Sequence, residues 1–467
     1  MKIKPIYIIS LICTIILFTS NFIFNLFLKF FPFIISLFPL LYLFRKKNQK
    51  KLESESIFEK RIKRFKTIKR GYYSLIILTV FYVISLISPL WMNNKPIMLA
   101  FKNGKYDEIE KYTDANGNGE YDEGELFTDK TKYYFPAIRD FFDFIPGISS
   151  PFYEAEVFNQ NISGISANFR LLKKQIKESN SDNYIVMPLY VYHPHEDLKD
   201  ELDEEFNDIN NNGKWDPGEA FSDDNNDGKW TENNPPTLPS KKHIAGTDNT
   251  GRDVFARLID GYKISMTFAV IVTTLSYIIG VIIGACLGYY GGKLDLFGLR
   301  LIEIFSSIPF LFMLMILGSF MKPGVFLLAL LSVLLKGWIG ITWYIRGEFF
   351  REKPKDYVSA AVSMGQSNWK IMFKHILPNS LTPIITFAPF SIIGDIGTLV
   401  ALDFLGYGLK PPASSWGNLL QQGAENLDYW HMLIFPVVAL TLTIFMITFI
   451  SEAVREAFDP KVYSRLR

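Results

Sequence analysis

The chain has 467 residues, of which 49% are hydrophobic and 21% are charged, and its formal net charge is +2. The apolar residues gather in long runs instead of being spread evenly, which argues against a single soluble domain and favours a protein embedded in a lipid bilayer. Both cysteines, Cys13 and Cys286, lie far apart in apolar runs, so neither a disulfide framework nor a zinc site is predicted.

The first predicted element is a two-helix membrane hairpin within residues 1–50. An apolar stretch at 7–44 has lysines before it and a basic run after it, so a turn within 21–29 would leave both flanks on one side. A signal peptide is the alternative, but the apolar core is too long for one and no small-x-small cleavage site follows it. A basic linker at 51–71 comes next.

Further apolar runs are each long enough to cross about 30 Å of hydrocarbon as a helix, which takes about 20 residues. These runs cover 72–91, 265–290, 297–320, 325–345, 381–402 and 432–450. The pattern predicts an all-α polytopic protein of the cytoplasmic membrane.

The distribution of charge orients these spans. Residues 45–70 are rich in Lys and Arg, whereas residues 94–249 are rich in Asp and Glu. Because basic loops favour the cytoplasmic side, we expect the basic loop at 346–375 and both chain ends to be cytoplasmic. A nucleic-acid contact is the alternative for 45–70, but this stretch joins two membrane segments, which favours orientation and contact with anionic lipid. The predicted parts are a first core span at 72–92, an external insert at 93–250 and the remaining core at 251–467.

The external insert contains two copies of the calcium-loop pattern D-x-[DN]-x-[DN]-G-x5-E. Oxygen atoms at alternate positions surround one ion in such a loop, while the glycine allows a sharp turn. The predicted ligands are Asp114, Asn116, Asn118, Glu120, Asp122 and Glu125 in the first copy, and Asp208, Asn210, Asn212, Lys214, Asp216 and Glu219 in the second. A third copy from Asp223 has Asn234 in place of the glutamate, so we expect it to bind more weakly.

These loops do not resemble EF-hands, because Glu219 is followed almost at once by Asp223 and no room remains for a flanking helix. We expect calcium to order the insert, with weak affinity suited to an external compartment. The alternative is a solvated turn repeat that binds nothing. His193 and His195 lie in a Tyr-His-Pro-His sequence that favours a turn, with nickel binding as the alternative.

The loop at 356–378 predicts a short helix, a glycine stop, a second helix and a proline break. Val358, Ala361, Val362 and Gly365 share one helical face, a stripe of small residues suited to docking against a partner. Gly365 suits a left-handed C-cap, and Pro378 is expected to end the second helix, which starts at Ser367 or Asn368.

These residues resemble the EAA loop of binding-protein-dependent ABC importers, E-A-A-x3-G-x9-I-x-L-P. Five positions match, at Ala360, Ala361, Gly365, Leu377 and Pro378. Ser359 replaces the glutamate and His375 replaces the isoleucine, so no salt bridge from position 359 is possible.

Residues 246–254 resemble the G-T-D-x-x-G-R-D-V segment that precedes the second core span in C-type permeases of dipeptide, oligopeptide and nickel importers. The runs at 300–309, 402–409 and 452–460 also resemble segments of this family. Tyr-Tyr-Phe-Pro at 133–136 is similar to a segment of the microcin C-type peptide permeases.

The resemblance implies a six-span type I ABC importer permease that moves peptide-like solutes. It implies a heterodimer with a second permease subunit, two cytoplasmic ATPases and an external solute-binding protein. The chain has no G-x-x-x-x-G-K-[ST] loop, so we expect partners to hydrolyse ATP and this subunit to be non-catalytic. The coupling residues implied are Tyr357, Val358, Ser359, Ala360, Ala361 and Gly365.

Two polar features lie within predicted spans. Arg300 and Glu303 are spaced to pair on one helix face. Asp395 lies between Gly394 and Gly397 in an apolar span, which favours a place on the translocation path with contact to a cationic solute, or a helix-helix hydrogen bond.

Other functions stay open at this point. One is an importer of nickel or another small solute, and the other is a calcium-stabilised surface or sensor protein that keeps a permease-like core. A membrane enzyme is disfavoured, because no nucleophile-histidine-acid set and no H-E-x-x-H pair accompanies the spans.

Overall fold

The computed structural model describes residues 57–102, 129–142, 155–158, 160, 166–179, 182–198, 209, 215–221, 235–321 and 324–459. The chain divides into two compact units. The sheet unit contains the described residues from Leu86 to Glu196, and the helical unit contains those up to Ser85 and those from Asp197 onward. The predicted hairpin at 1–50 and the first calcium loop lie outside the described residues.

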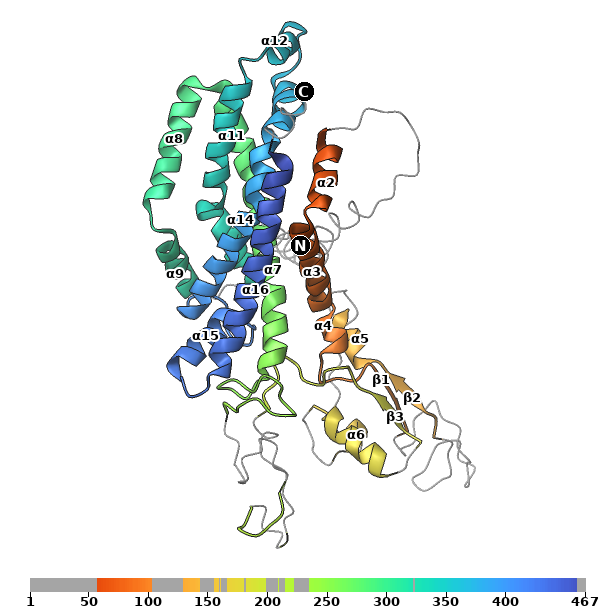
Figure 1. Ribbon diagram of the computed structural model, residues 1–467. Helices are drawn as coiled ribbons and strands as arrows, with labels where there is room; N and C mark the ends of the chain where they lie inside the picture. The colour runs from red at the N-terminus through yellow and green to blue at the C-terminus, as the bar shows by residue number, and fades with distance from the viewer. Residues whose placement is uncertain are drawn as a thin grey trace, which may run out of the picture. The chain divides into compact units, whose positions relative to one another are not determined.

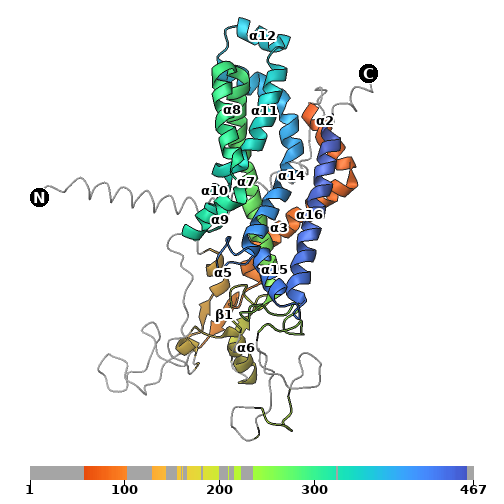
Figure 2. The same cartoon turned by 90° about the vertical axis from the view of Figure 1, so that its left-hand side faces the viewer.

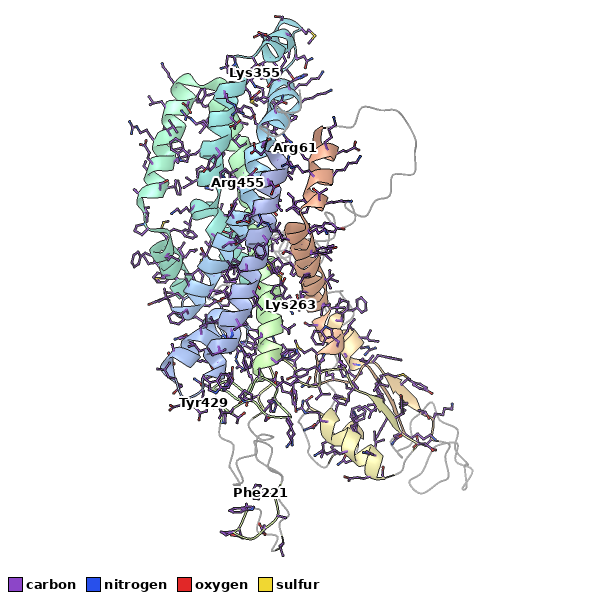
Figure 3. The ribbon with its side chains drawn as sticks, in the orientation of Figure 1. Arg61, Phe221, Lys263, Lys355, Tyr429 and Arg455 are labelled. Atoms are coloured by element: carbon purple, nitrogen blue, oxygen red, sulfur yellow. The ribbon has the colours of Figure 1, made fainter. Side chains whose placement is uncertain are left out.

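The helical unit is an elongated bundle with α12 at one end and α15 at the other, and Lys355 and Tyr429 mark these ends (Figures 1, 2 and 3). Its elements are α2 (Ile57–Thr67), α3 (Lys69–Leu86), α7 (Val254–Tyr290), α8 (Gly292–Ser307), α9 (Phe310–Phe320), α10 (Val325–Ser332), η3 (Val333–Gly337), α11 (Trp338–Glu352), α12 (Asp356–Ser363), α13 (Asn368–Lys370), η4 (Ile371–Ile376), α14 (Leu377–Phe404), α15 (Trp416–Glu425) and α16 (His431–Phe458).

Four of the six predicted membrane spans are confirmed as long helices, whereas 72–91 is divided between α3 and α4 and 297–320 between α8 and α9. Within the described ranges, the spans Val254–Tyr290, Val325–Glu352, Ile384–Phe404 and His431–Phe458 are each long and apolar enough to cross a membrane. The number rises from 4 to 6 if each of two bent pairs is one span, and these pairs join α2 to α3 at 93° and α8 to α9 at 70°. The second bend lies before Pro309, whose ring holds Ile308 in an extended conformation.

The helices α7 and α11 approach closely because three glycines of α7, Gly280, Gly284 and Gly288, face α11. A Cβ on Gly280 would lie 1.8 Å from a methyl group of Ile341, and one on Gly284 would lie 2.7 Å from the carbonyl oxygen of Thr342. The Thr342 hydroxyl donates to the carbonyl oxygen of Gly280 at 3.3 Å. Small residues four apart permit such backbone contact between membrane helices, where packing drives association.

Two of the helical runs contain a π-helical turn, η3 and η4. The second turn corrects the prediction that Pro378 ends a helix, because the chain stays helical from Asn368 through α14 to Phe404. Pro378 is the second residue of α14. The missing N–H costs little there, because the widened turn has already interrupted the regular hydrogen-bond pattern and proline suits the first turn of a helix.

The sheet unit has a small antiparallel sheet in the order β2-β1-β3. Its elements are α4 (Ser88–Trp91), β1 (Met98–Phe101), β2 (Lys132–Tyr134), α5 (Pro136–Phe141), η1 (Ala155–Phe158), α6 (Phe169–Glu178) and β3 (Tyr184–Val186). Leu99 pairs with Tyr134 on one side and Ile185 on the other. The sheet was not foreseen in the sequence.

The core of the sheet unit is aromatic. Buried Phe158 stacks edge-on against Phe101, with ring centroids 5.3 Å apart, and lies beside Phe169 at 5.5 Å. Arg170 of α6 donates to both carboxylate oxygens of Glu196 at 3.1 and 2.8 Å. The insert therefore folds around a hydrophobic core of its own and is more than a loop of polar turns.

Gly284→Ala should weaken the contact between α7 and α11, because the added Cβ meets a backbone carbonyl that cannot rotate away. We expect a loss of about 1–3 kcal/mol, as for other overpacked sites, measured as a lower melting temperature of the purified protein in detergent. Gly340→Ala is the matched control, since a Cβ at Gly340 of α11 meets nothing within 4 Å. Equal losses in both variants would rule out the packing explanation.

Candidate coupling site and polar groups of the membrane core

The loop predicted to couple the protein to a partner begins at a corner between α11 and α12. Glu352 ends α11 with 3% of its side chain exposed. Its carboxylate accepts hydrogen bonds from Nζ of Lys355 at 2.7 Å and from the Tyr357 hydroxyl at 2.9 Å. Burial raises the pKa of Tyr357, so the phenol stays protonated and keeps donating to Glu352. These contacts hold the corner in one geometry.

One face of α12 packs onto the bundle. Val358 is 3% exposed and Ala361 is 1% exposed, and both belong to a buried cluster that includes Ile371, Met372 and Phe349. The prediction that Val358 and Ala361 face a partner together with Val362 is therefore wrong. These two side chains are the apolar base by which α12 sits on the rest of the chain.

The opposite face of α12 is open to solvent. Ser359, Ala360 and Ser363 are exposed there, and Val362 and Met364 have exposed fractions of 55% and 68%. Trp369, after the turn, adds a further apolar side chain with 58% exposed. Exposed apolar groups in one small area are typical of a surface that another protein covers.

Gly365 ends α12 in the predicted way. Its φ is +72°, in the left-handed region that favours glycine. The N–H of Gly365 donates to the carbonyl of Val362, and that of Gln366 donates to the carbonyl of Ala361, which is the Schellman pattern. Nε2 of His375 lies 2.6 Å from Oε1 of Gln366 and closes the turn against the next helical segment.

Three further contacts tie this end of the bundle together, and the sequence does not indicate them. Arg346 of α11 donates to both carboxylate oxygens of Asp295 in α8, at 2.5 and 2.7 Å. The hydroxyl of Tyr289 donates to Asn368 at 2.9 Å, and Nζ of Lys353 donates to the carbonyl of Tyr289 at 2.6 Å. The loop after α11 is thereby bound to the end of α7.

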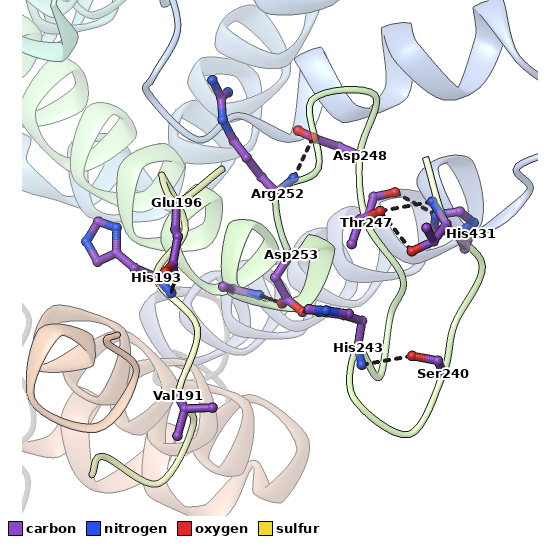
Figure 4. Close-up of polar contacts among 12 residues, drawn as sticks. Val191, His193, Glu196, Ser240, His243, Thr247, Asp248, Arg252, Asp253 and His431 are labelled. Carbon is purple, nitrogen blue, oxygen red and sulfur yellow. Dashed lines mark hydrogen bonds and ion pairs between the residues drawn. The ribbon is translucent and has the colours of Figure 1, made fainter. Parts of the chain in front are cut away.

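At the other end of the helical unit, residues 246–254 form a compact polar turn (Figure 4). Asp248 is fully buried, and its Oδ1 accepts the N–H groups of Thr250 at 2.8 Å and Arg252 at 3.0 Å. Its Oδ2 accepts a hydrogen bond from the guanidinium of Arg257, which is also fully buried. The need for a counter-charge to Arg257 and for an acceptor of two N–H groups accounts for the aspartate of the G-T-D-x-x-G-R-D-V segment.

Two histidines hold the same turn against neighbouring segments (Figure 4). Nε2 of His431, at the start of α16, lies 3.0 Å from the carbonyl oxygen of Thr247. Nδ1 of His243 lies 2.9 Å from Oδ2 of Asp253, whose Oδ1 caps α7 by accepting the N–H of Ala256 at 2.8 Å. The beginnings of α7 and α16 are therefore bound to one polar cluster.

The familial run at 402–409 contains another buried carboxylate. Asp403 accepts the N–H of Leu409 at 2.7 Å and the hydroxyl of Ser415, the N-cap residue of α15. A Cβ on Gly408 would lie 1.8 Å from Oδ1 of Asp403, so the position needs glycine. The run therefore ties the end of α14 to the segment that leads into α15.

The polar residues predicted in the spans lie in different surroundings, one pair on an exposed helix face and one residue at a cavity. Nη1 of Arg300 donates to Oε2 of Glu303 at 2.6 Å on an exposed face, which confirms that pair. Asp395 accepts a hydrogen bond at Oδ2 from the Thr273 hydroxyl at 2.7 Å and lines a cavity inside the helical unit.

The second calcium loop is described only in part. The carboxylate of Glu219 is 7% exposed and accepts the N–H groups of Ile209 at 2.9 Å and Asp216 at 3.0 Å. Trp215 donates from Nε1 to the carbonyl oxygen of Glu219 at 3.1 Å and stacks edge-on against Phe221. Across the described ranges, no group of three His, Cys, Asp or Glu side chains is placed to hold a metal ion; the other predicted ligands lie outside those ranges.

The histidine pair of the sheet unit forms a turn. The N–H of His195 donates to Nδ1 of His193 at 3.2 Å, and the N–H of His193 donates to Oε2 of Glu196 at 3.3 Å. Figure 4 shows the second of these bonds. This arrangement agrees with the turn interpretation, and among the described residues the pair is not part of a group of three or more His, Cys, Asp or Glu side chains that could hold a metal ion.

The chain was compared with known proteins. The family described as "Binding-protein-dependent transport system inner membrane component" matches residues 276–464. The chain is 38% identical over 221 residues to the oligopeptide transport system permease protein OppC of Haemophilus influenzae, covering 47% of this chain and 70% of that protein. This chain belongs to that family.

Two relatives match with higher identity. The chain is 43% identical over 216 residues to the peptidoglycan transport system permease protein YejE of Agrobacterium fabrum, covering 46% of this chain and 56% of the relative. It is 41% identical over 225 residues to the inner membrane ABC transporter permease protein YejE of Escherichia coli, covering 48% and 66%. The chain thus spans less than two thirds of the length of these two relatives.

Family membership confirms the predicted type I ABC importer permease fold and a multi-pass membrane protein. The matched residues include α12, η4 and α14, so the coupling loop lies inside the family region. The polar turn at 246–254 precedes it. The sequence does not predict that Arg257 contacts Asp248 or that His431 contacts Thr247, because no local pattern indicates which distant side chains meet in this turn.

Asp248→Ala should strongly destabilise this protein, because it leaves the Arg257 guanidinium buried without its counter-charge. We expect a loss of about 3–5 kcal/mol, measured as reduced membrane content and a lower melting temperature. Glu303→Gln breaks an exposed pair and should cost no more than about 1 kcal/mol. Similar losses in the two variants would contradict the structural role of the buried pair.

Proposed function

We propose that this protein is the transmembrane permease subunit of an ATP-driven importer that moves peptide-like solutes across the cytoplasmic membrane. The observation that carries the proposal is the form of α12, which has an exposed apolar and small-residue face on a buried base of Val358 and Ala361. A helix held so firmly, with its outer face open, is suited to passing a partner's movement into the bundle. The names of the relatives support a peptide-like solute.

The partners follow from the same proposal. They are a second permease subunit, two cytoplasmic ATPases and an external solute-binding protein. The end that carries α12 then faces the cytoplasm with both chain termini, and the turn at 246–254 faces outward with the insert. The basic residues Arg351, Lys353, Lys355, Lys370 and Lys374 near α12 support this orientation.

The mechanism is a coupled movement between two states. When the ATPases close on ATP, they displace the exposed face of α12. The Glu352 corner passes this displacement to α11, and the contact of Val358 and Ala361 with Ile371 passes it to the base of α14. The helices then move as rigid elements between inward and outward openings. Hydrolysis of ATP belongs to the partners, and this subunit is non-catalytic.

Ala360→Arg tests the coupling role, because Ala360 is exposed and the new side chain does not disturb the buried base. We expect the variant to reach the membrane and keep its second permease subunit, but to lose the ATPases during purification and lose ATP-driven uptake. Ala424→Arg, at an exposed position of α15, should retain the ATPases. Unchanged ATPase binding and uptake in Ala360→Arg would refute coupling through α12.

We also propose that the external insert binds calcium, with Asp216 and Glu219 as ligands of the second loop. The support is that Glu219 already draws the N–H groups of Ile209 and Asp216 together, so positions two, nine and twelve of the pattern converge on one carboxylate. Each Glu219 oxygen accepts one of these bonds, which leaves lone pairs for an ion. The calcium would stabilise the insert and would not be transported.

Calcium should raise the melting temperature of the purified protein with a dissociation constant on the order of 10⁻⁴ to 10⁻³ M. Glu219→Gln should remove part of this effect, while Glu425→Gln, an exposed carboxylate on α15, should leave it intact. Magnesium at the same concentration is the ionic control. The proposal fails if calcium and magnesium produce the same shift in all three proteins.

A further inference from the structure

A cavity of about 160 Å³, open on one side, lies in the helical unit among α7, α9, α10, α14 and the π-helical turn η3. Most of its wall is apolar, but two ionisable side chains, Asp395 and Lys336, line it together with the hydroxyl groups of Ser332 and Thr398. Ionisable groups within a membrane span are costly and mark the paths of charged solutes. Opposite charges on one small cavity therefore need an explanation.

The two charges do not neutralise each other in the described part of the chain. Asp395 contacts the Thr273 hydroxyl through Oδ2, and no ion pair within 4.0 Å joins it to Lys336 among the described residues. Nζ of Lys336 lies 5.9 Å from the centre of the Phe310 ring, a weak cation–π contact. A purely structural pair would be in direct contact, because separation leaves the Asp395 carboxylate in apolar surroundings without a counter-charge.

The surroundings of Asp395 leave room for a ligand. Its Oδ2 meets the Thr273 hydroxyl, and the cavity that it lines has a volume of about 160 Å³. Lys336 is exposed in the single chain, so its ammonium can meet a group that extends beyond the cavity. A cavity of about 150 Å³ holds a molecule of the size of benzene, so this one accommodates roughly one residue of a peptide.

We propose that this cavity is a solute-binding site for a zwitterionic amino acid or short peptide, with Asp395 contacting the ammonium group and Lys336 contacting the carboxylate. The inference rests on the proposed importer function and assigns a site and a solute chemistry to it. Thr273 positions the Asp395 carboxylate through its hydrogen bond to Oδ2, which leaves Oδ1 for the ammonium group. The apolar residues Phe268 and Val272 of α7 exclude water from the contact.

The test uses the complete importer, reconstituted in proteoliposomes with its ATPases and solute-binding protein. The probes are trialanine, N-acetyl-trialanine and trialanine amide, and each variant is scored by the ratio of blocked to free peptide uptake, relative to wild type. Preferences of the solute-binding protein cancel in this comparison. Asp395→Asn should lower trialanine uptake at least about tenfold, as loss of one partner of a desolvated charge contact does, with less than about a twofold change for N-acetyl-trialanine.

Lys336→Met should show the mirror pattern, losing trialanine uptake while trialanine amide is spared. Glu303→Gln, a membrane-helix carboxylate outside the cavity, should change none of the ratios. Thr273→Val keeps both charges, so a raised KM for trialanine with normal N-acetyl-trialanine uptake supports the site even if Asp395→Asn fails to assemble.

Two outcomes would overturn the inference, and they are distinguishable. If wild type transports the peptides but Asp395→Asn, Lys336→Met and Thr273→Val change all three probes equally, the cavity groups are structural and the importer function stands. If wild type transports none of the peptides while its ATPases respond to the loaded solute-binding protein, the peptide function itself fails, and with it the assignment of the cavity.

Discussion

The close contact between α7 and α11 is the constraint on which the helical unit depends. Gly280 and Gly284 allow the two backbones to touch, and α11 then carries Glu352 and the corner to α12 at one end. At its other end, α7 begins at the Asp253 cap inside the polar turn. Because packing, and not water, holds membrane helices together, a contact this close makes α7 and α11 move as one body. Displacement of α12 therefore has a rigid element on which to act.

Buried charges complete this arrangement at both ends. Asp248 with Arg257 and the Asp403 carboxylate lie near one end of the bundle, and Asp295 with Arg346 lies near the other. Such groups add little net stability compared with apolar packing, but each accepts one geometry only, because an unpaired charge inside the protein is costly. Their effect is to specify how the ends of the helices meet.

Part of this structure could be predicted from the sequence, and the missing part has physical reasons. Long apolar runs predicted the spans, and the glycine at 365 predicted the cap, because both signals are local. The orientation of Val358 and Ala361 was predicted wrongly, since small apolar residues suit a docking face as well as a buried one. Strands of three or four residues that pair across long intervening segments leave no periodic signal, so the sheet unit was not foreseen.

The candidate site shows the same division. Asp395 could be recognised as a functional candidate because it is an acidic residue in an apolar span. Lys336 was not predicted as a site residue, because the run that contains it indicates a membrane span by its hydropathy alone. Neither residue indicates the other, because they lie on different spans and meet only through the fold. Contacts such as Asp248 with Arg257 and Thr247 with His431 are equally invisible, although the turn that contains them was recognised by resemblance.

The position of α14 connects the two proposed roles. Its base is η4, which packs against the buried face of α12, and the same helix carries Asp395 farther along its length. At a rise of about 1.5 Å per residue, the 18 residues from Leu377 to Asp395 place the carboxylate roughly 27 Å from the coupling end. Displacement of its base moves the part of α14 that carries Asp395, with Pro383 and Pro389 between them as the places where the helix can bend. The cavity wall formed by η3 belongs to the run that leads directly into α11 and the Glu352 corner. Movement of α12 therefore acts on both walls that carry a charge, and separating them would weaken the hold on a zwitterion in one state and restore it in the other.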